Sequence, residues 1–196
     1  MSRELLRLMA YALKNFCLKW VSEGVVHMRC SLRVMSRSAL LAALVCLTTL
    51  VVKMPLGIGG AYVHAGDAFV YLAACLLPAP YAMAAGALGA GLADLLGGYA
   101  IYALPSAVIK CLLVLPFVRH GRLVCARNVL ALFVSAMIGL AGYFVVDWVL
   151  YGSVQTAVAT LVGGIAQPVV SAMVFLALGY ALDRVEFKKK FGWEIR

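Results

Sequence analysis

Charged residues are scarce in this sequence, and acidic residues are the scarcest. Of its 196 residues, 13% are charged and only 8 are Asp or Glu, whereas 65% are hydrophobic. Soluble globular domains are ~45–50% apolar and ~25% charged. This composition therefore excludes a soluble enzyme, a disordered chain and a disulfide-stapled secreted module.

The sequence also lacks the short motifs of several chemistries. It contains neither a GxxxxGK[ST] loop nor a GxGxxG turn, so we expect no ATP binding through a loop of its own. The six cysteines form no CxxC pair and have no histidine at metal-ligand spacing. We expect no metal site and no cofactor, and we interpret the cysteines as free thiols that pack as small apolar side chains.

A nearly continuous apolar region extends from about residue 39 to residue 182. At ~20 residues per membrane crossing, it accommodates about five to seven helices. The runs do not alternate with period two, which argues against a transmembrane barrel. We expect an all-α, polytopic membrane protein with six spans, at residues 38–52, 67–77, 81–96, 102–118, 129–150 and 154–182.

Two of these spans are irregular. The second is short for a hydrocarbon core ~30 Å thick, so it must borrow residues from its loops. In the sixth, Gly163, Gly164 and Pro168 predict a kink. In the third, Ala85, Gly89 and Ala93 form a small-residue stripe that predicts close packing on another helix of the same chain.

The 17 basic residues gather in three groups. Seven precede the first span, three lie within residues 119–127 and five follow the sixth span, which leaves only Lys53 and Lys110 elsewhere. Lys- and Arg-rich segments stay in the cytoplasm. This placement predicts an N-in, C-in topology, with four spans before residues 119–127 and two after them. It also explains the net charge of +9 without a nucleic-acid partner.

The chain divides into three regions: a basic N-terminal extension (1–35), a six-helix membrane domain (36–185) and a basic cytoplasmic tail (186–196). The extension has apolar residues at helical spacing, which favours an amphipathic helix on the inner surface of the lipid bilayer. It has no apolar run typical of a cleavable signal peptide. Alternatively, translation starts at Met35 and the first 34 residues are an artefact of the gene model.

Four ionisable side chains interrupt the spans: Asp67, Asp94, Lys110 and Asp147. Each costs a few kcal/mol at the bilayer centre, so such residues are candidates for a functional site. The predicted topology places the three aspartates at the outer ends of their helices and Lys110 about 9 Å below the outer start of the fourth span. A buried lysine needs a partner, and we expect Asp94 to supply it.

Further polar and aromatic side chains fall in the same outer half, and the inner half has few. They are Tyr62, His64, Tyr99, Tyr102, Trp148 and Tyr151, with Gln167 lying deeper. A channel or proton relay needs polar groups along its whole path, whereas a binding site that opens outward needs them at one end. The alternative reading is that the aspartates cap helices and the aromatics form an interfacial belt.

Three segments resemble the substrate-binding S components of energy-coupling factor (ECF) transporters. They are residues 60–70 (GAYVHAGDAFV), residues 89–105 (GAGLADLLGGYAIYALP) and Ile109-Lys110. They are most similar to the branch that takes up queuosine precursors, and the resemblance covers about residues 36–185. It implies a six-helix protein of the prokaryotic plasma membrane that binds a vitamin or a precursor from outside and has no ATPase activity.

The resemblance also implies partners and a transport cycle. The S component docks on a coupling membrane protein and two cytosolic ATPase subunits, then topples in the membrane to release its substrate. Docking in the family uses an AxxxA pattern on the first helix, which here falls on Ala39 and Ala43. The family's site lies at the outer side under a lid, which here corresponds to the glycine-rich residues 54–66.

The candidate ligand is a small heterocyclic nutrient. Three aspartates against Lys110 favour a neutral or cationic ligand, and a carboxylate accepts hydrogen bonds from a guanine-like N–H edge. Tyrosines offer stacking surfaces for a flat ring. We expect a deazaguanine of the queuine type, although other vitamins satisfy the same chemistry. The expected contacts are Asp67, Asp94, Lys110, Tyr99, Tyr102, His64, Tyr62, Asp147 and Gln167.

Two other classes of function stay open. A self-sufficient secondary transporter or channel would need polar residues through the inner half. A membrane enzyme or assembly factor would need a nucleophile with a base, or a metal cluster. His27, His64 and His120 are far apart in the sequence, and only His64 lies near the polar residues. We therefore expect this chain not to be an enzyme.

Overall fold

The computed structural model describes residues 32–52, 54–55, 62–119, 121–190 and 193, which belong to the unit Leu32–Arg196. The predicted amphipathic helix over residues 1–34 lies almost wholly outside the described residues. The described elements are α2 (Leu32–Val51), β1 (Met54–Pro55), β2 (Tyr62–Val63), α3 (Gly66–Leu76), α4 (Ala79–Leu96), α5 (Ala100–Val114), α6 (Ala126–Tyr151), α7 (Val154–Gly164), α8 (Ala166–Arg184) and α9 (Phe187–Lys190).

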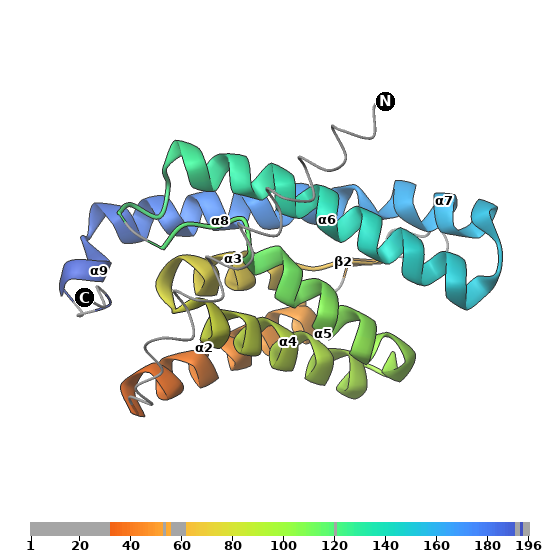
Figure 1. The fold of residues 1–196 in the computed structure, drawn as a ribbon, viewed down its shortest axis with the longest axis horizontal. Helices are drawn as coiled ribbons and strands as arrows, with labels where there is room; N and C mark the ends of the chain where they lie inside the picture. Colours follow the sequence, from red (N-terminus) through yellow and green to blue (C-terminus); the bar gives the residue numbers. More distant parts are fainter. Residues whose placement is uncertain (1–31, 53, 56–61, 120, 191–192, 194–196) are drawn as a thin grey trace, which may run out of the picture. The chain divides into compact units, whose positions relative to one another are not determined.

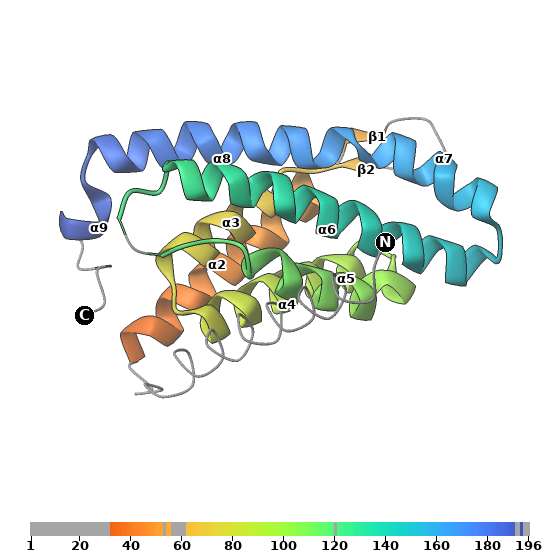
Figure 2. The same cartoon turned by 45° about the horizontal axis from the view of Figure 1, so that its top comes forward.

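The helices of this unit form two layers with α3 between them. Figures 1 and 2 show α6, α7 and α8 in one layer and α2, α4 and α5 in the other. Helix α3 packs against α2, α4 and α5 on one side and against α8 on the other. The short strands β1 and β2 pair antiparallel between α2 and α3, with Met54 opposite Val63.

Burial explains why α3 is short. Ten of its 11 residues are buried, and a helix of this length is only about 16 Å long. Its ends meet protein rather than lipid, so it does not have to cross a membrane by itself. It ends at Leu76. The next residue, Leu77, has an extended backbone (φ −103°, ψ 158°) because Pro78 disfavours helical geometry in the residue before it.

The small-residue stripe of α4 packs against α2, as the sequence predicted. Ala85, Gly89 and Ala93 are buried. A Cβ atom at Gly89 would lie 2.6 Å from the Ala42 carbonyl oxygen and 2.7 Å from the Val45 Cβ. Only glycine permits this close approach of the two helices.

The predicted kink in the last apolar segment is a break between two helices. Helix α7 ends at Gly164 and α8 begins at Ala166. Pro168 falls in the first turn of α8, where its missing N–H costs no hydrogen bond. The break places Gln167 in the same first turn.

Four helical segments are long and apolar enough to cross a membrane: α2, α4, α6 and the segment Val154–Arg184, which comprises α7 and α8. Helices α3 and α5 are apolar but shorter. Large apolar side chains are exposed along α6, including Leu130, Phe133 and Val149. An apolar outer surface of this extent is expected where a protein faces lipid, so the structure supports a multi-pass membrane protein.

The basic segments of this unit meet at one end of the bundle, which we call the basic end (Figure 1). Its described residues are the start of α2, residues 115–119 and 121–125, and residues 185–190 and 193. Lys188 Nζ donates to the carbonyl oxygens of Arg119 and Gly121 at 2.7 and 2.9 Å. The guanidinium of Arg37 lies 4.5 Å from the ring centroid of Trp193. The turn between α4 and α5 and the turn between α6 and α7 lie at the opposite end (Figure 1).

Candidate functional site

A cavity of about 320 Å³ lies between the two layers of helices. It is lined by residues of α2 to α8, by His64, which precedes α3, and by Tyr99, which precedes α5. Of the nine residues predicted to contact a ligand, eight line it: Asp67, Asp94, Lys110, Tyr99, Tyr102, His64, Asp147 and Gln167. The ninth, Tyr62, lies in β2, and its side chain is outside the described part of the structure.

An ion pair between α3 and α5 lies in this cavity. Lys110 Nζ is 2.6 Å from Asp67 Oδ1, and the two side chains are 2% and 6% exposed. The prediction that Asp94 partners Lys110 is therefore wrong. Asp67 stands in the first turn of α3, where the positive end of the helix dipole favours a carboxylate, and α3 packs directly on α5. Asp94 is buried in the last turn of α4 and lines the same cavity.

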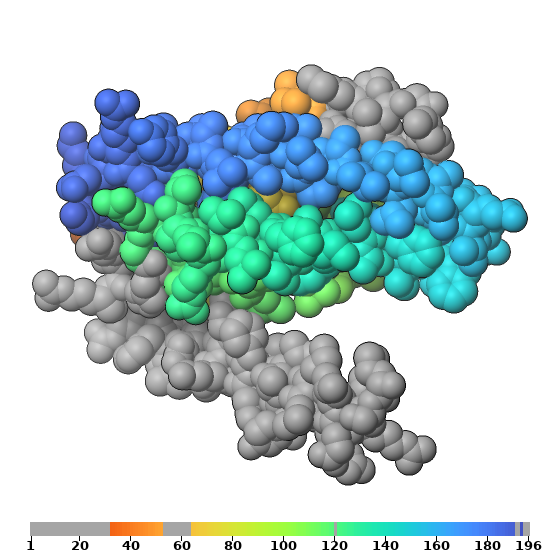
Figure 3. Space-filling view, turned by 90° about the horizontal axis from the view of Figure 1, so that it is seen from above, coloured from red at the N-terminus to blue at the C-terminus, as the bar shows by residue number. Residues whose placement is uncertain are grey.

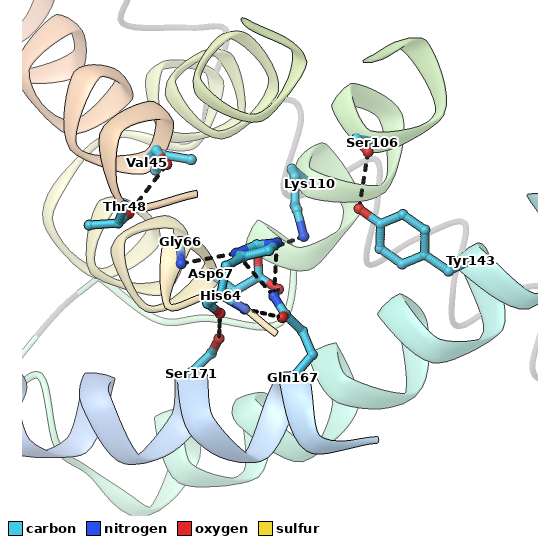
Figure 4. Close-up of polar contacts among 10 residues, drawn as sticks. All are labelled: Val45, Thr48, His64, Gly66, Asp67, Ser106, Lys110, Tyr143, Gln167 and Ser171. Carbon is cyan, nitrogen blue, oxygen red and sulfur yellow. Dashed lines mark hydrogen bonds and ion pairs between the residues drawn. The ribbon is translucent and has the colours of Figure 1, made fainter. Parts of the chain in front are cut away.

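Gln167 connects this ion pair to α8. Its Nε2 donates to Asp67 Oδ2 at 3.2 Å, and its Oε1 accepts the backbone N–H of His64 at 2.8 Å. Nε2 also lies 3.0 Å from Nε2 and 3.2 Å from Nδ1 of the His64 ring. Figure 4 shows Gln167 reaching from α8 toward His64 and Asp67.

Hydrogen bonds hold both the ring and the backbone of His64 in place. Its Nδ1 accepts the backbone N–H of Gly66 at 3.1 Å, and its carbonyl oxygen accepts the hydroxyl of Ser171 at 3.3 Å. A Cβ atom at Gly66 would collide with Thr49 Oγ1, so glycine allows α3 to begin beside α2. We call His64, Asp67, Lys110 and Gln167 the polar floor of the cavity.

Tyrosines form the walls toward the opposite end. Tyr102 of α5 donates its hydroxyl to Asp147 Oδ1 of α6 at 2.8 Å and lies 3.0 Å from the hydroxyl of Tyr151. Tyr99 also lines the cavity, with 39% of its surface exposed. Trp148 does not line the cavity: it is 49% exposed on the outside of α6.

Several lining residues were not predicted from the sequence. Tyr143 shares a hydrogen bond of 3.1 Å with Ser106, and its ring centroid lies 5.3 Å from Lys110 Nζ. The other lining residues with hydroxyl groups that were not among the nine predicted contacts are Thr49, Tyr71, Ser135, Tyr151 and Thr160. The sequence could have indicated two of them, because Tyr143 and Ser135 are isolated polar residues within the apolar run of the fifth predicted span.

An aromatic trio, Tyr71, Phe117 and Phe175, separates the polar floor from the basic end. Ring centroids are 5.1 Å apart for Tyr71 and Phe117, 6.0 Å for Tyr71 and Phe175, and 5.9 Å for Phe117 and Phe175. Tyr71 follows Asp67 by one turn of α3, in the direction of the basic end. The cavity is therefore one-sided within the described residues.

The half of the bundle near the basic end is more polar than the sequence predicted. Asn128 is fully buried: its Oδ1 accepts the N–H of Val118 at 2.9 Å, and its Nδ2 donates to the carbonyl oxygens of Val118 and Leu123. Asp183 accepts the N–H groups of Leu123 and Val124, both at 2.9 Å. These side chains hold the α5–α6 link in place and do not extend the cavity.

The cavity is acidic and suited to binding. Three carboxylates and one ammonium group line it: Asp67, Asp94, Asp147 and Lys110. Carboxylates accept hydrogen bonds and attract positive charge, so this lining favours a ligand with N–H donors or a positive charge. Among the described residues, no three His, Cys, Asp or Glu side chains come together as metal ligands do.

This chain is similar to an uncharacterized relative and matches the model of a family of transporter components. A relative from Pyrococcus woesei, described as an uncharacterized protein, is 31% identical over 142 residues, which are 71% of this chain and 95% of the relative. A family model described as "ECF-type riboflavin transporter, S component" matches residues 29–184, most of the chain and all of the cavity. The chain belongs to this family of ECF transporter S components.

Proposed function

We propose that this chain captures a small, flat nitrogen heterocycle for an ECF transporter and binds it in the cavity above the polar floor. The combination of a polar floor with tyrosine walls, in one cavity at one end of a membrane bundle, carries this proposal. Its volume of about 320 Å³ is at the low end of the ~300–1,000 Å³ typical of small-molecule sites. A ligand of one or two fused rings suits this size.

The expected ligand is a queuosine precursor of the deazaguanine type. Its guanine-like N–H edge would donate to Asp94 or Asp147, and its rings would stack on Tyr99 or Tyr143. Riboflavin is the second candidate because the family takes its name from riboflavin transport. Its three-ring system and ribityl chain need more room, which favours the smaller base.

The proposed topology has six membrane helices with both termini in the cytoplasm. The basic end would then face the cytoplasm, and the cavity would face outside. Residues 56–61 of the predicted lid lie outside the described residues. A periplasmic-type phosphatase fused after Gly98 should be active, and a fluorescent protein at the C-terminus should mature. The reverse pattern would overturn this orientation.

ATP hydrolysis would belong to two partner subunits, joined to this chain by a coupling membrane protein. Ala39 and Ala43 support this arrangement because both are exposed on α2. A pair of small residues at this spacing lets another membrane helix approach closely. The chain reconstituted alone in vesicles should bind the ligand and should not transport it. Uptake without partners would favour the secondary transporter.

Binding to the purified chain tests the proposed ligand. Calorimetry with a deazaguanine and quenching of riboflavin fluorescence would measure the two affinities, and mass spectrometry would identify molecules that co-purify. Asp94→Asn should weaken binding of the preferred ligand about 10- to 100-fold, as expected for a hydrogen bond to a charged group. Glu186→Gln, an exposed acid at the basic end, is the matched control.

Two results would contradict the assignment of the ligand site. One is wild-type affinity in Asp94→Asn. The other is loss of folded protein in Asp94→Asn but not in Glu186→Gln, because Asp94 would then have a structural role. Tight binding of riboflavin with no binding of any deazaguanine would keep the site but replace the substrate.

A further inference from the structure

A second cavity, of about 560 Å³, lies at the basic end. The last turn of α8, the short helix α9 and residues 121–124 of the α5–α6 link form it. Figure 3 views the α6–α8 face, where the blue end of α8 adjoins the green link. Its charged lining residues are Arg122, Asp183, Arg184, Glu186, Lys188 and Lys189.

The acidic side chains of this cavity are already engaged. Both oxygens of Asp183 accept backbone N–H groups at 2.9 Å. Glu186 lies 3.3 Å from Lys189, and each of these side chains is 65% exposed. Among the described residues, neither Arg122 nor Arg184 forms an ion pair. Two guanidinium groups therefore remain for an anion, and their planar fork matches phosphate oxygens.

Lys188 places an ammonium group at a fixed position in this cavity. Its side chain is buried, and Nζ donates to the carbonyl oxygens of Arg119 and Gly121. An ammonium group has three donors, so one remains. Burial lowers the pKa of Lys188, and a bound anion would stabilise its charged form.

An apolar stripe leads along α8 to this cavity. Val169, Met173 and Tyr180 are 53%, 58% and 64% exposed, and with Arg184 they recur at helical spacing on one face. Arg184 ends the stripe and lines the cavity. A ligand that has both a phosphate group and an acyl chain would match the cavity and the stripe together, whereas a soluble phosphate would use only the cavity.

We propose that the cavity formed by Arg122, Arg184 and Lys188 binds the phosphate group of an anionic phospholipid whose acyl chain lies along the exposed face of α8. The shared chemistry is a phosphate anion, and the stripe selects the lipid as its source. In the proposed topology, this cavity faces the cytoplasmic leaflet, where basic pockets bind lipid headgroups.

Native mass spectrometry of the full chain, purified in detergent, tests this proposal. Phosphatidylglycerol, phosphatidylcholine, glycerol phosphate and inorganic phosphate are added separately. The wild type should retain phosphatidylglycerol in preference to the other three. Arg122→Gln with Arg184→Gln should reduce this retention about 25-fold, from about fivefold for each arginine. Arg184→Lys keeps the charge but loses the planar fork. Its lipid retention should lie between that of the wild type and that of the double variant.

Arg127→Gln is the matched control because Arg127 is exposed at the same end but does not line the cavity. Elution in size-exclusion chromatography verifies that each variant is folded. Equal retention of both lipids, or an equal loss in Arg127→Gln, would overturn the proposal. So would retention of inorganic phosphate as strong as that of phosphatidylglycerol. Unchanged lipid retention with lost uptake in the double variant would assign the cavity to a protein partner instead.

Discussion

Replacing Lys110 by Met should destabilise the chain strongly, because it leaves a carboxylate without its counterion in a buried site. The Lys110–Asp67 contact is 2.6 Å long, and both side chains are almost fully buried. Removing one partner of a buried ion pair costs about 3–5 kcal/mol. Gln167 still donates to Asp67, so we expect the loss in free energy of unfolding to lie near the lower limit of this range.

A double-mutant cycle separates the ion pair from its surroundings. Asp67→Leu alone leaves the ammonium group of Lys110 uncompensated and should cost a similar amount. The double variant, Asp67→Leu with Lys110→Met, replaces both charges by apolar groups and should be more stable than either single variant. It should remain about 1–3 kcal/mol below the wild type, because Gln167 loses an acceptor.

Unfolding by a denaturing detergent, followed by tryptophan fluorescence, would measure these free energies. Lys189→Met is the matched control: the same substitution removes an exposed pair with Glu186, and surface pairs contribute about 0–1 kcal/mol. Our reasoning would be refuted if Lys110→Met were as mild as Lys189→Met. It would also be refuted if the two single costs added up in the double variant, since the two residues would then not interact.

Three further predictions concern packing, docking and the cavity wall. Gly89→Ala should cost about 1–3 kcal/mol in the same unfolding assay, because its Cβ would lie 2.6 Å from the Ala42 carbonyl. In Gly91→Ala the nearest atom is 3.4 Å away, so it should be neutral or slightly stabilising; equal losses would contradict the packing. Ala43→Leu should leave the ligand Kd unchanged and abolish uptake in cells that contain the partner subunits. Persistent uptake would show that docking does not use this part of α2. Tyr102→Phe removes the hydroxyl that joins α5 to α6 and should weaken ligand binding about 5- to 10-fold; an unchanged Kd would exclude Tyr102 from the site.

The helices could be predicted from the sequence because their signals are local. Proline and glycine mark the ends of α3 and the break between α7 and α8, and the predicted and observed bounds agree within a few residues there. The start of the first span was placed at Ser38, but α2 begins at Leu32. Arg33 and Arg37 obscured this start, since arginines at the end of a membrane helix reduce its hydropathy without interrupting its backbone.

The residues that line the candidate site could be predicted from the sequence, but the ion pair among them could not. Charges that interrupt apolar runs reveal which residues avoid lipid, and eight of the nine predicted ligand contacts line one cavity. The partner of Lys110 depends on which helices adjoin in space. Asp94 is nearer in sequence, whereas α3 brings Asp67 to α5. Asn128 was missed for the same reason, because its partners in residues 118–123 become close only in the folded chain.

The placement of α3 favours motion of the whole chain over opening of a path through it. Within the described residues, the contacts of Tyr71 with Phe117 and Phe175 lie between the polar floor and the basic end. Tyr71 belongs to α3, which is buried between both layers and joined to α5 by the ion pair of Asp67. Moving α3 would expose these charges to apolar surroundings at a cost of several kcal/mol. Rotation of the intact bundle by a partner would break none of these contacts. We therefore expect the partner to act through the exposed part of α2 that carries Ala39 and Ala43, and not through the ligand site.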